Sequence, residues 1–307
     1  MTERRRANDV RVARAAADLI TQCRIESLPV DVEAIAKRLE IQVEDADLPA
    51  DFFGATASDG VSMRILVSHR CPTRTHRRFT ICHEIGHCCI DGHAQALFER
   101  ERLHMSVGGI GAPKEPVEVE ADSFAAMLLM PETLIAPVMA KYHPSLDMVR
   151  AVAAAADVSL IAAALRCTEL VADPFAIAVS ERGLIEWVSF SSGLHEYHWT
   201  RRKWKGEAVP TDSATMTLAK SRARVAAAEV EVADMGLTDW FSGAPPVRVD
   251  EEAIGLGSYG RILTILRPGT LPTADQVEHA ERRARETKGD WRDTMRPYHW
   301  DDPDDPD

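Results

Sequence analysis

The chain has 307 residues, of which 45% are hydrophobic, and its formal net charge is −12. This length is enough for two domains with their own cores. The acidic balance argues against broad binding to nucleic-acid phosphates, and no apolar run approaches the roughly 18 residues that a membrane span needs. The N-terminus is charged, and the six cysteines lack a disulfide-type spacing, so we expect a cytoplasmic protein with reduced thiols.

Two helices and a strand are predicted in the first quarter of the chain. The helices cover residues 8–23 and 31–39, the second with the pattern Val-x-x-Ile-Ala-x-x-Leu. Residues 61–67 alternate in polarity, which predicts a strand.

The sequence His83-Glu84-Ile85-Gly86-His87 follows this strand and is an H-E-x-x-H motif. A helix is predicted here, and Pro72 suits its first position. In a helix the two histidines lie one turn apart on one face and can share a tetrahedral Zn²⁺. Glu84 is then placed to take a proton from a water on the metal. Two helical histidines can also be ordinary core or surface residues, but the apolar flanks favour a metal site.

A third ligand is expected because zinc in a hydrolytic site takes three protein ligands. Pro116 opens a predicted helix in which Glu118 and Asp122 share a face. A ligating glutamate with an aspartate one turn later is chemically suitable, since the aspartate can accept a hydrogen bond from a ligating histidine. The alternative is that Glu118 and Glu120 only favour the helix N-terminus through its dipole, an interpretation we apply to Glu120. Periodicity alone does not separate the two glutamates.

The segments on either side of this helix are predicted from their glycine, proline and helix-capping residues. Residues 92–115 carry Gly108, Gly109, Gly111 and Pro113 and are predicted as a mobile loop between the metal-binding helices. Residues 144–170 predict two short helices, capped by Ser145 and Ser159, with the spacing of a helix-turn-helix. Their two arginines are outnumbered by three acidic residues, and the second helix lacks base-reading side chains. A packing unit is therefore favoured over a DNA reader.

The pattern changes to strands from about residue 171. Residues 175–180 and 184–189 predict a hairpin. A helix spanning residues 218–228 and strands at 246–255 and 261–267 follow, and a last helix is predicted over 273–288. A polar-aromatic cluster in this region is either a sensor pocket or ordinary packing; it consists of His195, Tyr197, His198, Trp199 and Trp204.

Several of these motifs together resemble one known family. Residues 28–36 and Arg77-Arg78-Phe79-Thr80 precede the H-E-x-x-H motif, and two further motifs follow it: Glu118-x-Glu120-Ala121-Asp122-x-Phe124-Ala125-Ala126 and Leu128-Leu129-Met130-Pro131. They resemble the ImmA/IrrE family of metallopeptidases. The resemblance is specific over roughly residues 10–170. To about residue 268, the length and strand pattern are similar to the longer, IrrE-type members.

The resemblance implies a gluzincin-like site that binds one metal ion. The ligands would be His83, His87 and Glu118, and the ion would be Zn²⁺, with Mn²⁺ as the alternative. Glu84 would be the catalytic base, and Asp122 would support a ligating histidine. The expected activity is zinc-dependent endopeptidase cleavage of a helix-turn-helix transcriptional repressor, in control of stress, phage, mobile-element or toxin–antitoxin genes.

The resemblance also implies where substrate binds and how activity is controlled. The 61–67 strand would form the rim of the cleft, where an extended peptide can pair with it; a plain sheet strand is the alternative. Longer family members carry a GAF-like region near the C-terminus, so a small molecule is one expected signal. Cys88-Cys89 replaces the aliphatic residues that we expect after the motif, which adds a redox signal as a second; small core residues are the favoured alternative.

We therefore predict an α+β protein in four parts. A gluzincin-like metallopeptidase domain covers residues 1–143, and a helix-turn-helix-like segment covers 144–170. An α+β, GAF-like sensor domain covers 171–290, and an acidic disordered tail covers 291–307.

Two alternatives belong to other functional classes. The first is a transcriptional regulator that binds DNA through residues 144–170, against which the acidic charge counts. The second is a partner protein that holds a repressor without cutting it, which would have no use for a base at Glu84.

Overall fold

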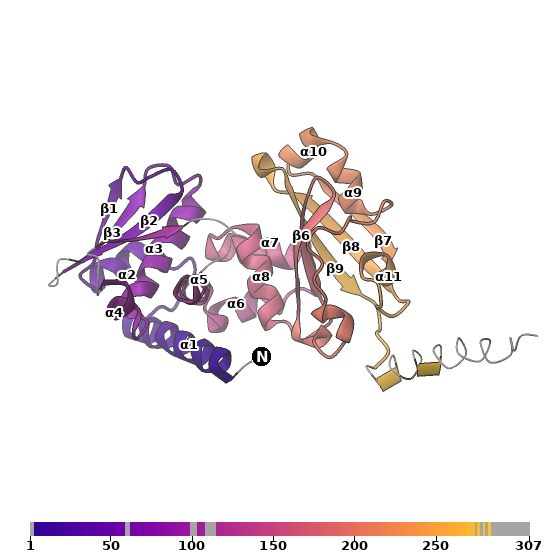
Figure 1. Ribbon diagram of the computed structural model, residues 1–307, viewed down its shortest axis with the longest axis horizontal. Coiled ribbons are helices and arrows are strands. Elements are labelled where there is room, and N and C mark those ends of the chain that lie inside the picture. Colours follow the sequence, from indigo (N-terminus) through magenta and orange to yellow (C-terminus); the bar gives the residue numbers. More distant parts are fainter. Residues whose placement is uncertain are drawn as a thin grey trace, which may run out of the picture.

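The computed structural model describes residues 3–58, 62–98, 103–107 and 115–273, and beyond them 275, 276, 279, 282 and 283. Two sheets flank a central group of helices, with the first sheet at the left of Figure 1 and the second at the right. This is the α+β architecture that the sequence predicts. No single helix among the described residues is long and apolar enough to cross a membrane. Two bent helix pairs reach that length and composition together: Pro116–Leu129 with Glu132–Met139, and Leu146–Ala156 with Leu160–Leu170.

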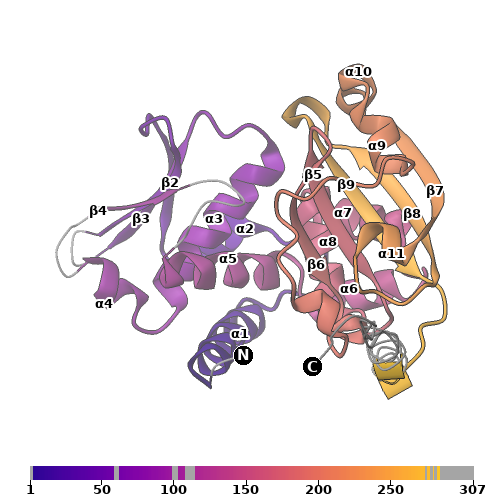
Figure 2. The same ribbon diagram turned by 45° about the vertical axis from the view of Figure 1, so that its right-hand side comes forward.

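Two helices open the chain as predicted. The first is α1 (Glu3–Cys23), which packs along α5 (Pro116–Leu129). Figures 1 and 2 both show it beneath the first sheet and its helices. The second is α2 (Val32–Arg38), whose N-cap residue Asp31 accepts a hydrogen bond from the backbone of Ala34 at 3.0 Å.

The first sheet has the strand order β1-β3-β2-β4. Its strands are β1 (Gln42–Ala46), β2 (Phe52–Ser58), β3 (Met63–Ser68) and β4 (Leu103–Val107). The predicted strand at 61–67 is β3, but it pairs with β1 on one side and β2 on the other. A strand with both edges paired cannot accept a peptide, so the prediction that it forms the rim of the cleft was wrong.

The predicted loop over 92–115 was wrong for two of its segments. The structure has α4 (His93–Phe98) and β4 there, and β4 pairs antiparallel with β2. The glycine-rich part, 108–114, lies outside the described residues. Strand β4 is an edge strand of the first sheet, because among the described residues it pairs with β2 alone.

The two long helices of this part are α3 (Arg74–Cys89) and α5, which pack against each other. Thr73 caps α3 by accepting a hydrogen bond from the backbone of His76 at 3.1 Å, so the predicted start at Pro72 was two residues early. Helix α5 begins at Pro116, as predicted. A short helix, α6 (Glu132–Met139), follows it.

The predicted helix pair is present as α7 (Leu146–Ala156) and α8 (Leu160–Leu170), with Ser145 and Ser159 as the N-caps. The two helices are bent by 112°, which is a helix-turn-helix angle. In α8, however, Glu169 is the one exposed residue. The helix packs against two strands of the second sheet, so it presents no free face.

The second sheet is antiparallel, with the strand order β6-β5-β9-β8-β7. Its strands are β5 (Ala176–Glu181), β6 (Leu184–Phe190), β7 (Val230–Gly236), β8 (Arg248–Gly255) and β9 (Arg261–Pro268). The hairpin β5–β6 and strands β8 and β9 were predicted, whereas β7 was not. Arg182 and Gly183 make the hairpin turn, both with positive φ.

The connections of the second sheet are short helices. The single helix expected over 218–228 is two: α9 (Ala214–Ala219) and α10 (Arg222–Ala226). The others are α11 (Leu237–Trp240) and the 3₁₀ turns Ser192–Leu194, His198–Arg201 and Gly257–Tyr259. The helix predicted over 273–288 lies mostly outside the described residues, and the tail from 291 lies entirely outside them.

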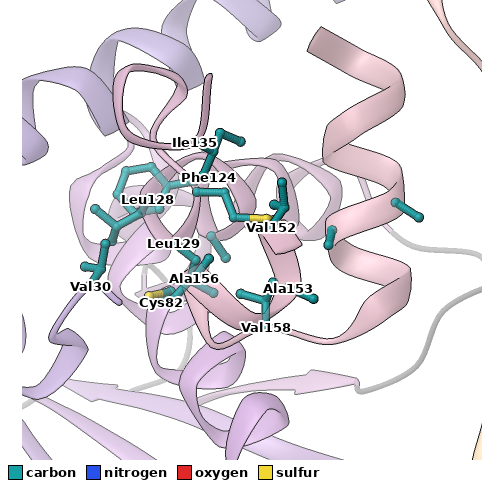
Figure 3. Packing of buried hydrophobic residues seen from close by; sticks show 14 of the residues in the cluster. Val30, Cys82, Phe124, Leu128, Leu129, Ile135, Val152, Ala153, Ala156 and Val158 are labelled. Atoms are coloured by element: carbon teal, nitrogen blue, oxygen red, sulfur yellow. The ribbon is translucent and has the colours of Figure 1, made fainter. Parts of the chain in front are cut away.

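One hydrophobic core joins the two sheets. Strand β5 shows how, because its side chains alternate: Ile177 and Val179 belong to the same core as Phe124 of α5, whereas Ala176 and Ala178 face a second, aromatic cluster. Figure 3 shows the part of the first core around Phe124, Leu128 and residues of α7. The second sheet is therefore built onto the helices that carry the site.

The aromatic cluster on the other face of the second sheet is a packed core. Tyr197, Trp199 and Trp204 are buried, and Trp199 and Trp204 pack with Phe241 at ring-centroid distances of 5.3 and 5.0 Å. The two histidines of the predicted cluster, at positions 195 and 198, are exposed. Ordinary packing therefore describes these aromatic residues.

Candidate metal centre

Three potential metal ligands meet where α3 crosses α5. His83 and His87 are one turn apart on α3, and their Nε2 atoms are 3.1 Å apart. Glu118, in the first turn of α5, places Oε2 3.2 Å from His83 Nε2 and Oε1 3.3 Å from His87 Nε2. All three side chains are buried, and their ligand atoms lie within 4.8 Å of one another. No other group of three such side chains comes as close among the described residues.

The chemistry of this triad fits a divalent cation. Glu118 Oε2 is buried and accepts no hydrogen bond, although His83 Nε2 is near. Lone pairs brought this close repel one another unless a positive charge lies between them. Two imidazoles and a carboxylate are the ligands that Zn²⁺ takes in hydrolytic sites, with the fourth position open. The triad can therefore hold such an ion.

The electrostatics of the triad also favour positive charge at its centre. Burial opposes a charged imidazole, but the ion pairs with Asp122 and Glu118 raise the pKa of His83 to about 9. Burial likewise opposes a charged carboxylate, but the hydrogen bond from His104 and the two nearby imidazoles hold the pKa of Glu118 far below its usual range. In the metal-free protein, a proton on His83 therefore stands where a cation would bind.

Glu84 lies between α3 and β2, and its two carboxylate oxygens have different surroundings. The side chain is fully buried, and Oε2 accepts a hydrogen bond of 2.6 Å from Thr56 Oγ1. Oε1 is buried and has no hydrogen-bond partner within the described structure. Gly54 makes room for it, because a Cβ at that position would lie 2.5 Å from Oε1. One oxygen is thus fixed, and the other can accept a proton.

His83 and Glu118 each have a hydrogen-bond partner that fixes a ligand of the triad. Asp122 Oδ1, one turn after Glu118, lies 2.9 Å from His83 Nδ1, as the helical spacing predicted. His104 Nε2, on β4, lies 2.9 Å from Glu118 Oε1. Such contacts fix the orientation of a ligand side chain. His104 was missed because its segment was assigned to a loop.

Glu120 does not join the triad, but it is more than a helix-dipole residue. Its side chain is buried and accepts hydrogen bonds from His93 Nε2 at 2.8 Å and from Arg11 of α1. His93 Nδ1 in turn lies 3.2 Å from His87 Nδ1. The dipole interpretation of Glu120 was therefore wrong, and no local pattern could have corrected it, because Arg11 is 109 residues away in the sequence.

Comparison with known proteins gives the family of this region. Residues 32–168 match the family model Peptidase_M78, described as the IrrE N-terminal-like domain. We call residues 32–168 the IrrE N-terminal-like domain after this similarity. No curated protein matches the sequence. Among solved structures, the chain is similar to a Mycobacterium tuberculosis transcriptional regulator, with a TM-score of 0.53 and 14% identity over 84% of this chain and 76% of that one. At this identity the likeness concerns the fold alone.

The IrrE N-terminal-like domain begins at the first residue of α2 and ends two residues before the end of α8. It contains the triad, Glu84 and Asp122, and it is metallopeptidase-like. The match bears out the resemblance to the ImmA/IrrE family over residues 32–168. Helix α1 and the second sheet lie outside the match.

The paired cysteines of the IrrE N-terminal-like domain have the environment of packing residues. Cys88 and Cys89 are free, and both pack against the first core. Burial raises the pKa of Cys89 to about 11, and it raises the pKa of Cys88 as well. Since the thiolate is the reactive form of cysteine, burial works against easy oxidation of this pair.

Proposed function

We propose that this protein is a zinc-dependent endopeptidase. The observation that carries the proposal is the buried triad of His83, His87 and Glu118 beside a carboxylate oxygen of Glu84 that has no partner. A site that only bound metal would have no need of this fourth group. Membership of residues 32–168 in Peptidase_M78 supports the same reading.

Each residue around the metal position has its own role in the proposed reaction. When bound, Zn²⁺ supplies Lewis-acid chemistry, which activates a water and polarises the scissile carbonyl. Glu84 Oε1 takes the proton of the attacking water and later passes it to the leaving amine. Thr56 holds Oε2 at 2.6 Å, so the carboxylate keeps one orientation through both transfers. Asp122 and His104 keep their two ligands in place.

We propose that the substrate pairs with the free edge of β4. This strand pairs with β2 alone among the described residues, so its other edge can hydrogen-bond an added strand. It also carries His104, which contacts Glu118, so a peptide on this edge would pass beside the triad. Strand β4 thus takes the role that the sequence alone assigned to the 61–67 strand.

We further propose that the target is a helix-turn-helix transcriptional repressor, cut in one flexible segment. The resemblance to the ImmA/IrrE family supports this substrate class. The geometry of β4 supports the same class, because a peptide must be extended to pair with this strand. A loop or a locally unfolded stretch of a folded partner can meet this condition.

Direct DNA binding is the second candidate function. The fold similarity to a transcriptional regulator and the 112° angle between α7 and α8 favour it. Against it, α8 is packed on the second sheet and exposes Glu169 alone, and the chain carries a net charge of −12. A recognition helix needs a free basic or polar face. Cleavage of a repressor is therefore the function we favour.

The test of the proposed activity is Glu84→Gln. The zinc-loaded chain is incubated with purified helix-turn-helix repressors encoded beside its own gene, and with a quenched-fluorescence peptide library. Wild type should cleave one repressor at a single segment. Glu84→Gln should keep its zinc but cleave at least about 10²–10⁴-fold more slowly, because an amide cannot accept the proton. Equal rates would remove Glu84 from the mechanism, and binding without cleavage by wild type would favour the partner-protein alternative.

We also propose that the second sheet controls the site through α7. Glu252 Oε2 on β8 accepts a hydrogen bond of 2.9 Å from the backbone N–H of Leu146, the first residue of α7. A chain truncated near residue 172 would expose the shared core, so the test uses the full chain. Glu252→Gln should change turnover at constant zinc content, whereas Asp250→Asn on the same strand should not. Equal turnover in both variants would contradict this route of control.

A further inference from the structure

A chain of hydrogen bonds lies behind His87, on the side away from the triad. His87 Nδ1 is 3.2 Å from His93 Nδ1, and His93 Nε2 is 2.8 Å from Glu120 Oε2. The same Glu120 oxygen accepts a hydrogen bond from Arg11 of α1. His83, by contrast, meets the carboxylate of Asp122 directly. The two histidines of the triad are thus supported in different ways.

The direction of each hydrogen bond in this chain is determined by the triad. His87 Nε2 faces Glu118 and the metal position, so in a metal-loaded site its proton is on Nδ1. His93 Nδ1 must then accept that proton's hydrogen bond. Neutral His93 keeps its own proton on Nε2 and donates it to Glu120. Both hydrogen bonds are therefore donated in the same direction, from His87 to His93 and from His93 to Glu120.

Because these side chains are buried, the hydrogen bonds behind His87 depend on the charged carboxylate of Glu120. His93 is 1% exposed and Glu120 is 8% exposed, and a buried carboxylate needs a positive partner or several donors. Arg11 provides the charge, and it also donates a hydrogen bond to the backbone carbonyl of Asp91, just after the end of α3. Arg11 of helix α1 therefore contacts both the segment that follows the metal-binding helix and the carboxylate behind its second histidine.

We propose that His93 is a positioning residue for His87, held by Glu120 and Arg11, so that α1 is part of the metal centre. This inference rests on the proposed zinc site. It extends the functional unit beyond the family match, because Arg11 lies before residue 32. It also gives α1 a chemical role: the helix keeps one metal ligand in the tautomer and orientation that binds zinc.

The experiment compares two replacements of His93 of similar size in the full-length chain. His93→Gln retains an acceptor for His87 and a donor for Glu120, whereas His93→Leu fills the space with neither. Zinc affinity is measured by competition with a chelator. His93→Leu should lose about 10–100-fold in affinity, and His93→Gln should stay close to wild type. A role in packing alone predicts that leucine is tolerated at least as well as glutamine.

A second pair of variants tests the contribution of Arg11 on helix α1 without altering His93. Arg11→Gln should lower zinc affinity by about tenfold. Arg14→Gln, on the same helix, should leave it unchanged, because the Arg14 side chain is 82% exposed and pairs with Asp18 at the surface. This pair decides the matter if His93→Leu does not fold. Proton NMR of the cobalt-loaded protein gives an independent readout. His93→Leu should speed the solvent exchange of the N–H proton of one ligand histidine and leave the exchange of the other unchanged.

The outcomes separate this inference from the proposed function. If wild type binds no zinc at one ion per chain, the proposed metal site fails and the inference fails with it. If wild type binds zinc and His93→Leu or Arg11→Gln binds it as tightly, the inference alone is overturned. Loss of affinity in these variants, with retention in His93→Gln and Arg14→Gln, supports it.

Discussion

Replacing Gly54 with alanine should disable Glu84 while leaving the metal ligands in place. Gly54 lies on β2, and its Cα faces the carboxylate of the proposed base. Its φ is not positive, so alanine is compatible with the backbone. The substitution therefore acts through its neighbours: the added Cβ would lie 2.5 Å from Glu84 Oε1 and 2.6 Å from Thr80 Cγ2.

The size of the effect follows from these distances. Ordinary contact begins at 3.4 Å, so the Glu84 carboxylate must retreat by about 0.9 Å. A misplacement of about 1 Å at a reacting group can lower turnover on the order of 100-fold. Overpacking of a filled core destabilises a protein by about 1–3 kcal/mol. We therefore expect a folded, somewhat less stable protein with roughly 100-fold lower turnover.

Three measurements on the purified chain check this prediction: bound zinc, the free energy of unfolding and the rate of repressor cleavage. Gly269→Ala is the matched control, because its Cβ would make an ordinary contact of 3.5 Å with the carbonyl oxygen of Arg248. Wild-type turnover per bound zinc in Gly54→Ala would refute the reasoning. An equal loss in Gly269→Ala would show that the effect is not specific to Glu84.

Four further predictions concern the triad and its partners. Asp122→Ala should lower zinc affinity or activity by about 10–100-fold, and unchanged chelator competition would contradict its supporting role. His104→Leu removes the donor to Glu118 and should weaken zinc binding by about tenfold, with cleavage restored in excess zinc if the role is positioning alone. Zinc must displace the proton of His83, whose pKa is raised to about 9, so affinity should rise with pH until about 9; a flat profile above pH 6.5 would argue against this competition. In the metal-free protein pH has the opposite effect, this time on stability. The contribution of His83 to the free energy of unfolding is present below its unfolded pKa near 6.5 and is lost as pH rises through about 9. Unfolding titrations at several pH values would show this loss.

Local sequence patterns predicted the elements that carry the triad. The i, i+4 spacing of His83 and His87 and the helix start at Pro116 are properties of single helices, and α3 and α5 formed accordingly. The caps Ser145 and Ser159 marked α7 and α8 for the same reason. In each case the signal and the structure it specifies lie within a few residues of each other.

Features that depend on distant pairing were not predictable from these patterns. Strand β4 is a strand because it pairs with β2, about 50 residues earlier, where Met105 faces Ala55. Its own five residues beside a glycine-rich stretch give a weak signal. The order of strands is likewise a tertiary property, so the sequence could not show that β3 is an inner strand and β4 an edge strand.

The polar residues around the triad were missed for a related reason. Thr56 and Arg11 reach Glu84 and Glu120 across 28 and 109 residues. A threonine in a strand and an arginine on an amphipathic helix have ordinary explanations on their own. Their roles come from the packing of β2 and α1 against the metal-binding helices, which brings each beside a carboxylate.

The core shared by the two sheets has a consequence for the order of events during synthesis. The ribosome releases the chain from its N-terminus, and cores form when their last members emerge. The triad is complete by residue 118, yet the core beneath it includes Ile254, Leu263 and Ile265 of the second sheet. Until those strands appear, the shared core lacks these three side chains. We therefore expect the nascent chain to reach its metal-binding form only after residue 265 has left the ribosome, so a shorter nascent chain would have an incomplete metal centre.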